Sequence, residues 1–433
     1  MRRKLDNTGD AIGESQDIMV RREETGQALL ACLLAHGNSE AADRTKRLSE
    51  CEWDQVIRES LRQGVLPLLY QGLGNASIRS LVPNRVIQTL RELAVHSSVK
   101  SLRVRRELGE TLRALRAEGI PVIVLKGGYL ASIVYGDHAA RPMRDLDLLV
   151  MRRDLERAEA ALLELGYSRH PDKEGDYSEC EHLQPLIGRH GVPIEIHWTI
   201  ASPTEPIHID VNGLWERAQA ARIADVDVNA LAPEDLLLHL CVHTSLTHQL
   251  ELGLRACWDI LEVTRHFGEA IDWEHVRQRA GEWRVEKYVY MTLRLAAELL
   301  GASIPDRVLT TLEPTGFKAE LITMARREVL LGQAAPSVSP RFAEMCGRGR
   351  LRERAHLVCD TLLPSRTALR KLYPACVDRK WICIFYVLRW RDLLRKYGRA
   401  LWRVVCRDEQ VMSLVRWEHE RARLMDWLKC VPA

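Results

Sequence analysis

The segment VIVLKGGYLASIVYGDHAARPMRDLDLLV, residues 122–150, decides the fold of this chain. It begins with four apolar residues and ends in an alternation of acidic and apolar residues, so both ends are predicted to be β-strands. Between them lies a K-G-G turn at 126–128, then an apolar stretch at 129–135 that is predicted to be a short helix. The Gly-Asp pair at 136–137 ends that helix. The segment therefore predicts a strand, a turn, a short helix and a second strand.

Two carboxylates, Asp145 and Asp147, lie at the mouth of the second strand. Residues i and i+2 of a strand point to the same face, so the two are predicted to project together. Carboxylates this close repel each other unless a cation lies between them, and a hard cation such as Mg²⁺ suits oxygen ligands. The glycine turn before the helix offers backbone N–H groups near the positive end of the helix dipole, which favours phosphate. Together these features predict a metal–nucleotide site, although an Asp-x-Asp motif alone more often marks a solvated strand edge.

A later stretch, V-P-I-E-I-H-W at 192–198, alternates between two faces. Its isoleucines take one face, and Glu195 and His197 take the other. If this strand lies beside the one that carries Asp145 and Asp147, Glu195 supplies a third carboxylate. The alternative is a solvent-exposed glutamate on an edge strand.

Length and charge indicate an ordinary globular protein of two to three domains. The chain has 433 residues, 46% of them hydrophobic and 28% charged, and a net charge of +3. The charge is uneven, because the segment from Gly347 onward has 20 Lys and Arg against 9 Asp and Glu. Such a basic segment favours an anionic partner, which could be nucleic acid, a nucleotide or a membrane surface.

The cysteines and the chain start indicate a cytoplasmic protein. The 11 cysteines are scattered without a C-x-x-C pair, which favours reduced thiols. The first 15 residues are polar and lack the apolar core of a signal peptide. The apolar run at 381–388 is far shorter than the ~20 residues of a membrane-spanning helix.

Helical periodicity surrounds the predicted strands. A long helix is predicted from Asn84 to Glu118, and nearly all of the sequence after Pro233 has a helical pattern. The predicted fold class is α+β, a small mixed sheet flanked by N-terminal helices and a larger C-terminal all-helical region. The predicted parts are a disordered N-terminus at 1–22, helices at 23–119, a core at 120–232, a helical domain at 233–335 and a basic helical region at 336–433.

Two pairs of polar residues are spaced four apart in predicted helices, and for both pairs a structural role is the plainer interpretation. His239 and His243 are four residues apart, but H-E-x-x-H is absent, so packed or hydrogen-bonded histidines are favoured over a metal site. Arg255 and Asp259 have the same spacing, for which a simple i, i+4 ion pair is the plain interpretation.

The basic C-terminal region contains an amphipathic stretch at 381–405, in which Arg and Lys alternate with apolar and aromatic residues. A packed helix with a solvated cationic face is favoured. Peripheral contact with an anionic membrane and a grip on single-stranded nucleic acid are the alternatives.

Three motifs in order resemble a family of uncharacterised nucleotidyltransferases within the DNA polymerase β-like superfamily. They are L-K-G at 125–127, R-P-M-R-D-L-D-L-L-V at 141–150 and I-E-I-H-W at 194–198. The helices with His243 and Asp259 also look like that family's helical half. The likeness runs from about residue 25 to about 400 and is densest between 121 and 260. The superfamily's usual Gly-Ser turn is Gly-Gly here, preceded by Lys126, which could act as a point charge on phosphate.

The resemblance implies a set of site residues. Asp145, Asp147 and Glu195 would be the catalytic carboxylates and would hold two Mg²⁺ ions, and Glu195 could also act as general base. The residues expected to bind the nucleotide are Lys126, Gly127, Gly128, Arg141 and Arg144. Arg144 has the alternative role of bracing the carboxylate pair. The residues expected around this set are His197, His243 and Asp259.

The implied activity is Mg²⁺-dependent transfer of a nucleoside monophosphate from an NTP, with ATP favoured, to a hydroxyl acceptor, with release of pyrophosphate. A small molecule or peptide natural product is the preferred acceptor. The alternatives are an enzyme that modifies RNA or protein, as a toxin would, and a catalytically silent nucleotide-binding regulatory module. The sequence identifies neither the acceptor, the base of the NTP, the pathway nor the oligomeric state.

Overall fold

The computed structural model describes residues 10–35, 37–171, 177, 179–331, 363, 385–392 and 409–429. The chain divides into two compact units. One comprises Thr25–Gln333 with Leu428–Ala433, and the other comprises Met1–Glu24 with Ala334–Trp427. The first unit contains the sheet and the residues of the predicted site. Much of the predicted basic region, including most of the amphipathic stretch at 381–405, lies outside the described residues.

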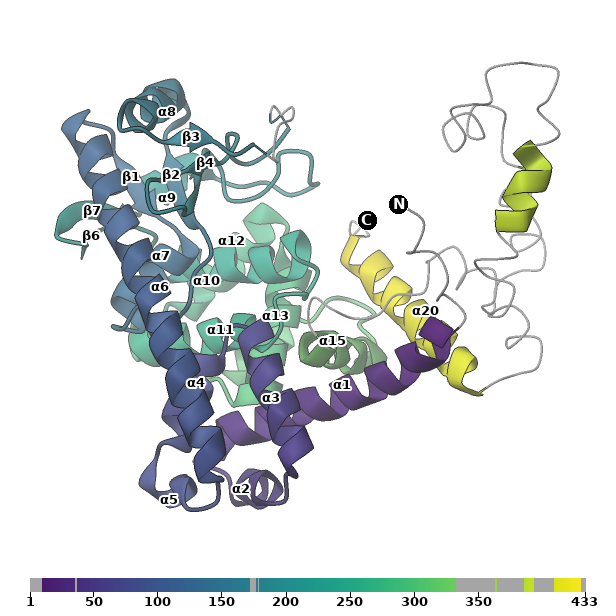
Figure 1. The fold of residues 1–433 in the computed structure, drawn as a ribbon. Coiled ribbons are helices and arrows are strands. Elements are labelled where there is room, and N and C mark those ends of the chain that lie inside the picture. Colours follow the sequence, from purple (N-terminus) through teal and green to yellow (C-terminus); the bar gives the residue numbers. More distant parts are fainter. Residues whose placement is uncertain are drawn as a thin grey trace. The chain divides into compact units, whose positions relative to one another are not determined.

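Six helices precede the first strand (Figure 1). They are α1 (Asp10–Leu34), α2 (Ser39–Lys46), α3 (Glu50–Arg62), α4 (Leu66–Leu73), α5 (Ala76–Arg79) and α6 (Asn84–Ala117). The helix α1 begins at Asp10, within the segment 1–22 that was predicted to be disordered, and that division of the chain stays a prediction. The long helix α6 confirms the helix predicted from Asn84.

The seven strands form one mixed sheet in the order β3-β4-β5-β2-β1-β7-β6. They are β1 (Val122–Val124), β2 (Leu146–Val150), β3 (Ser168–Arg169), β4 (Leu186–Ile187), β5 (Pro193–His197), β6 (Gln219–Ile223) and β7 (Val226–Ala230). β2 runs parallel to β5 and β1 runs parallel to β7, while the other neighbouring pairs are antiparallel. The sheet with its surrounding helices confirms the α+β fold class.

The centre of the sheet is apolar because both of its faces are covered. Every residue of β1 and β2 is buried. The helices α7 (Lys126–Tyr129), which continues as a π-helix at Leu130–Val134, and α8 (Leu155–Glu164) contact the sheet, and α9 (Val211–Glu216) precedes β6. The helix α6 contacts α4, α8 and β7, so it connects the N-terminal helices to the sheet (Figure 1).

A buried carboxylate on α6 holds the turn that precedes β5. Glu107 is fully buried and accepts hydrogen bonds from the backbone N–H groups of Arg189 at 3.2 Å and His190 at 2.6 Å. Gly188 leaves room for this carboxylate, which a Cβ at position 188 would overlap. The α6 helix therefore fixes the β4–β5 turn and, through it, the strand that carries Glu195.

A helical region follows β7. Its elements are α10 (Pro233–Val242) with a π-helix at His243–Thr247, α11 (Leu254–Phe267), α12 (Trp273–Trp283), α13 (Glu286–Leu300), α14 (Asp306–Leu312) and α15 (Ala319–Leu331). The helix α11 packs on α10, α13 and the π-helix at Leu130–Val134, which brings it against the start of the sheet domain. A last described helix is α20 (Glu409–Lys429). None of the described helices combines the length and apolarity that crossing a membrane requires.

Candidate active site

A sharp turn between β1 and α7 places Lys126 over the second strand. Its backbone has φ of 35°, a left-handed conformation that is uncommon for a residue with a side chain. Strain of this kind persists where the surrounding structure imposes it, often at functional sites. The turn directs the Lys126 Nζ to Asp147 Oδ1 at 3.0 Å, and both side chains are largely buried.

Asp147 and Glu195 face each other across the parallel strands β2 and β5, where they are register partners. His197 lies two residues beyond Glu195 on the same face. Its Nε2 donates to Asp147 Oδ1 at 3.0 Å and lies 3.7 Å from Glu195 Oε2. One donor atom from each of the three residues lies within 4.8 Å of the others. The predicted alternation of the β5 stretch thus brings Glu195 and His197 to Asp147.

Two internal cations compensate these carboxylates. Burial raises the pKa of Asp147, but Lys126 and then His197 outweigh it and hold that pKa well below its ordinary value. Burial and Asp147 likewise raise the pKa of Glu195, but His197 and His182 together outweigh them, so that pKa falls to about 2. The His197 pKa is lowered by burial and raised by its two carboxylate partners, with a net rise. The site is therefore a compact set of two carboxylates, an ammonium and an imidazole.

Asp145 lies one residue before β2 and has an exposed side chain. It is not among the three residues whose donor atoms cluster within 4.8 Å. Its pKa is nevertheless raised, first because the surrounding protein withdraws water from it and then because Asp147 repels its charge. Asp145 therefore stands at the mouth of the site, within electrostatic reach of Asp147, and its role as a metal ligand stays a prediction.

The two glycines of the turn are tightly packed. A Cβ on Gly127 would lie 2.8 Å from an Arg141 nitrogen and 3.0 Å from Met143 Cγ, and one on Gly128 would lie 2.8 Å from Val124. Close packing therefore requires glycine at both positions. The expected contact of Gly127 and Gly128 with phosphate remains a prediction.

Arg141 is bound to the helical region. Its Nε and Nη2 donate to the two carboxylate oxygens of Asp259 at 2.8 and 2.7 Å, and the Tyr135 hydroxyl donates to Asp259 at 2.8 Å. The partner of Asp259 is thus Arg141, which is 118 residues away in the sequence. The sequence had suggested a simple i, i+4 pair with Arg255 instead. Arg144, by contrast, has an exposed side chain just before Asp145.

Three histidines form a row at the end of α10. The ring centroids of His239 and His243 are 6.1 Å apart, and those of His243 and His248 are 4.4 Å apart. Burial, and then the charge of Lys126, lower the pKa of all three. They are neutral, packed imidazoles close enough to Lys126 to feel its charge, which agrees with the structural interpretation of His239 and His243.

One residue of the site was not identified from the sequence. His182 lies in a bridge to His197, and its Nε2 is 3.8 Å from Glu195 Oε2. His182 comes from a polar stretch without clear periodicity, so its place in the site becomes visible only in the folded structure.

A family model described as uncharacterised nucleotidyltransferase matches residues 49–301, more than half of the chain. The chain belongs to this family. The match covers α3 to the end of α13 and therefore includes the turn at Lys126, the carboxylates and the row of histidines. No curated protein and no solved structure matches the chain at the threshold applied. The protein is accordingly a nucleotidyltransferase.

The residues of this nucleotidyltransferase fit a divalent cation. The carboxylate oxygens of Asp147 and Glu195 are donors that Mg²⁺ and Mn²⁺ accept, and the imidazole of His197 is a third donor. His197 Nδ1 is buried without a hydrogen-bond partner among the described residues, so its hydrogen-bonding capacity is not exhausted. In the structure, Lys126 and His197 contact these carboxylates.

Proposed function

We propose that the enzyme transfers a nucleoside monophosphate from Mg²⁺-bound NTP, with ATP as the favoured donor, to a hydroxyl acceptor. The observation that carries the proposal is the register pair of Asp147 and Glu195 on β2 and β5, with Lys126 and His197 on the same carboxylates. Two carboxylates facing each other in a buried site are the oxygen donors that phosphoryl chemistry with magnesium requires.

In this proposal Asp147 and Glu195 hold the metal, and Asp145 adds a carboxylate at the mouth of the site. Magnesium, when bound, lowers the pKa of the attacking hydroxyl and neutralises the leaving pyrophosphate. Lys126 lies at the start of α7, where an ammonium can meet phosphate oxygens once Asp147 has another counter-ion. Arg144, exposed beside Asp145, is the second cation available to the triphosphate.

The transfer balances as a substitution at the α-phosphorus. The acceptor oxygen forms a bond to the α-phosphorus, and the bond from that phosphorus to the bridging oxygen breaks. Pyrophosphate leaves with the bonding electron pair, and the hydroxyl proton passes to Glu195 or to water. Because the pKa of Glu195 is about 2 in the metal-free structure, its carboxylate is a weak base and suits a metal ligand better.

The acceptor favoured here is a small molecule or a peptide. The alternatives are an enzyme acting on RNA or protein and a regulatory module without turnover. The presence of both Asp147 and Glu195 favours catalysis over a silent module, since the carboxylates proposed to hold the metal are intact. The cytoplasm is the proposed compartment, on the grounds of the scattered cysteines, and Cys32, Cys241 and Cys257 are buried free thiols in the structure.

The test is transfer of label from α-³²P-labelled NTPs in the presence of Mg²⁺ and cell extract. We expect the wild-type protein to label an acceptor and Asp147→Asn and Glu195→Gln to reduce labelling by at least about a hundredfold. Asp227→Asn, which changes an exposed aspartate on β7, is the matched control and should label normally. Labelling that survives in both site variants would remove these carboxylates from the reaction.

A further inference from the structure

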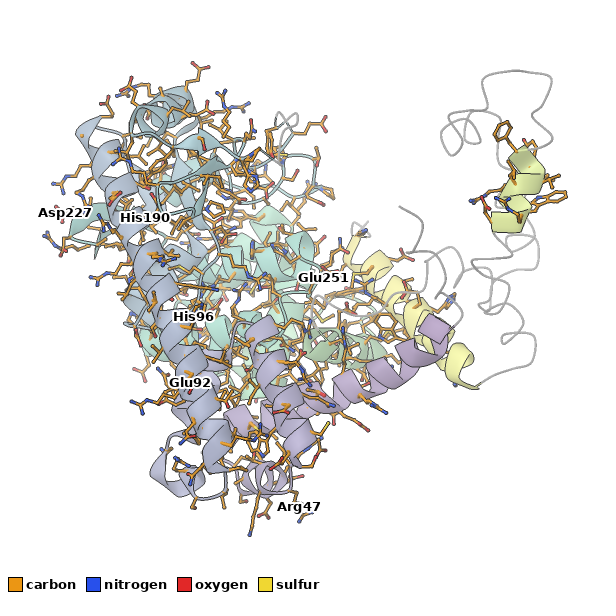
Figure 2. All side chains as sticks on the ribbon, in the orientation of Figure 1. Arg47, Glu92, His96, His190, Asp227 and Glu251 are labelled. Carbon is orange, nitrogen blue, oxygen red and sulfur yellow. The ribbon has the colours of Figure 1, made fainter. Side chains whose placement is uncertain are left out.

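A cavity of about 250 Å³ is lined in part by the loop that leads to Asp145, and none of the three carboxylates of the site lines it. It is bounded by the α3–α4 junction, by α6, by the loop before β2 and by the segment before α11. His96 on α6 and Glu251 before α11, both labelled in Figure 2, are two of its lining residues. Met143 and Arg144 also line it, and they directly precede Asp145.

The charge of the cavity is strongly positive. Its lining contains the four cations Arg62, Lys100, Arg144 and Arg255, against the single carboxylate of Glu251. Leucines, two prolines and Met143 form much of the rest of the wall. Positive charges that share a partly apolar cavity repel one another unless an anion enters, because the low dielectric of the walls strengthens each interaction.

Arg255 is the central residue of this argument. Within the described parts of the chain, its guanidinium forms no hydrogen bond and no ion pair, because Asp259 one turn along α11 is bound to Arg141. Burial and then the neighbouring Arg141 lower the pKa of Arg255, and the more distant charges of Asp259 and Asp145 do not offset them. Gly64 (φ 69°) packs against its stem, where a Cβ would lie 3.3 Å from Arg255 Cδ. The side chain is therefore held in place while its charge lacks a counter-ion.

Arg62 adds a second incompletely satisfied guanidinium. It donates to Glu59 and to the Leu331 carbonyl, while its Nη1 is buried without a partner among the described residues. Arg144 likewise forms no ion pair within the described part of the chain, and it is exposed. A guanidinium binds planar carboxylates and phosphates through paired N–H groups, so these residues suit such an anion.

We propose that this cavity binds an anionic group of the acceptor, a phosphate or a carboxylate, and so holds the acceptor beside Asp145. The inference rests on the proposed function, since it assigns the second substrate of that reaction. The cavity is smaller than the ~300–1,000 Å³ of pockets that enclose drug-sized ligands, so it takes one end of a molecule and not a whole NTP. Met143 lines the cavity and packs against Gly127, so it separates this cavity from the turn proposed for the NTP phosphates.

The proposal narrows the acceptor to molecules that carry both a hydroxyl and an anionic group. A neutral sugar or alcohol would leave Arg255 and Arg144 uncompensated in the bound state and would bind weakly. A hydroxyl acceptor with a phosphate or carboxylate would neutralise them, and its binding would weaken as salt concentration rises.

The experiment measures binding of two kinds of ligand to the full-length protein by calorimetry. The first kind is inorganic phosphate, O-phosphoserine and malate, each of which carries a phosphate or carboxylate group and no nucleoside. The second is α,β-methylene-ATP with Mg²⁺, which reports on the nucleotide site. The variants are Arg255→Gln, Arg144→Gln and, as matched control on the same helix, Arg265→Gln, whose exposed side chain pairs with Glu262. A thermal melt of each variant confirms that it is folded.

We expect at least one of the three anions to bind the wild-type protein, and Arg255→Gln and Arg144→Gln each to weaken that binding by about tenfold. Arg265→Gln should bind the anions as the wild type does, and neither Arg255→Gln nor Arg265→Gln should change the affinity for the ATP analogue by more than about twofold. Failure of all three anions to bind, or loss of ATP-analogue binding in Arg255→Gln, would overturn the acceptor assignment. Absence of ATP-analogue binding to the wild type would instead contradict the proposed function itself, whichever anions bind.

Discussion

Arg141 on the loop before β2 forms a two-pronged ion pair with Asp259 on α11, through bonds of 2.8 and 2.7 Å. The two side chains are 9% and 6% exposed, so the pair is buried. It ties the loop that leads to Asp145 and Asp147 to the helical region. Because Asp259 is bound to Arg141, Arg255 has no ion-pair partner among the residues that the structure describes, which connects the architecture of the site to the charge of the neighbouring cavity.

We expect Asp259→Ala to lower the free energy of unfolding by about 3–5 kcal/mol, because it leaves the Arg141 guanidinium buried and unpaired. Urea denaturation of the full-length protein measures the change. Asp227→Ala is the control, since its ion pair with Arg116 has both side chains more than half exposed, and it should cost less than about 1 kcal/mol. Equal losses in the two variants would show that the buried pair has no special part in stability.

Glu107→Ala should destabilise the β4–β5 turn by about 3 kcal/mol, because it removes a buried carboxylate that accepts two backbone N–H groups. Hydrogen exchange should rise at His190 and along β5. Glu110→Ala, one turn away on the same helix and partly exposed, should cost less than about 1 kcal/mol. Unchanged exchange along β5 in Glu107→Ala would contradict the role given to this carboxylate.

Lys126→Met should strengthen binding of Mn²⁺ in the absence of nucleotide by about tenfold, because a cation that competes for Asp147 is removed. The same variant should bind an NTP analogue more weakly, since an ammonium near the phosphates is lost. Calorimetry measures both affinities, and Lys46→Met on the distant helix α2 serves as control. Weaker Mn²⁺ binding in Lys126→Met would refute competition between the lysine and the metal.

The stability of the protein should fall between about pH 7.5 and about pH 5.5 in part because of His239. Burial and then Lys126 hold its folded pKa well below 6.5, with His197 adding repulsion and Asp147 opposing it. Below the unfolded pKa the unfolded chain therefore binds a proton that the folded chain does not. Stability is complete above that pKa and is lost as the pH falls toward the folded value.

His239→Asn removes this contribution, so its unfolding free energy should depend less steeply on pH than that of the wild type. His266→Asn, an exposed change on α11, should leave the dependence unaltered. Urea denaturation at several pH values measures the slopes. A slope in His239→Asn equal to that of the wild type would exclude His239 as a source of the dependence.

The sheet strands that bear the carboxylates were predictable because their sequences alternate. The D-L-D-L-L-V run became β2, and the I-E-I-H run became β5, with Asp147 and Glu195 as register partners. The adjacency of the two strands did not follow from local sequence, since each strand has several possible neighbours. The expectation that they are adjacent came from the resemblance to the family. The structure confirms this adjacency.

The hairpin of β6 and β7 was not predicted, although β7 pairs with the first strand. Its turn consists of Ala224 and Asp225, at φ of 49° and 64°, where Asn-Gly is the usual signal for such a geometry. An alanine gives no sign in the sequence that its φ will be positive, so the turn could not be predicted. Without a predicted turn, the V-D-V-N alternation that follows was not sufficient to predict a hairpin. The partner of Asp259 was likewise out of reach, because spacing along one helix cannot reveal an arginine 118 residues away.

The most direct test of the account is the position of a bound metal. Crystals of the full-length protein, grown with MnCl₂ and a non-hydrolysable NTP, would give an anomalous signal from Mn²⁺. We expect that signal between the carboxylates of Asp147 and Glu195, with the Lys126 ammonium moved from Asp147 toward the phosphates. A nucleotide bound with its Mn²⁺ away from both carboxylates would contradict the central claim.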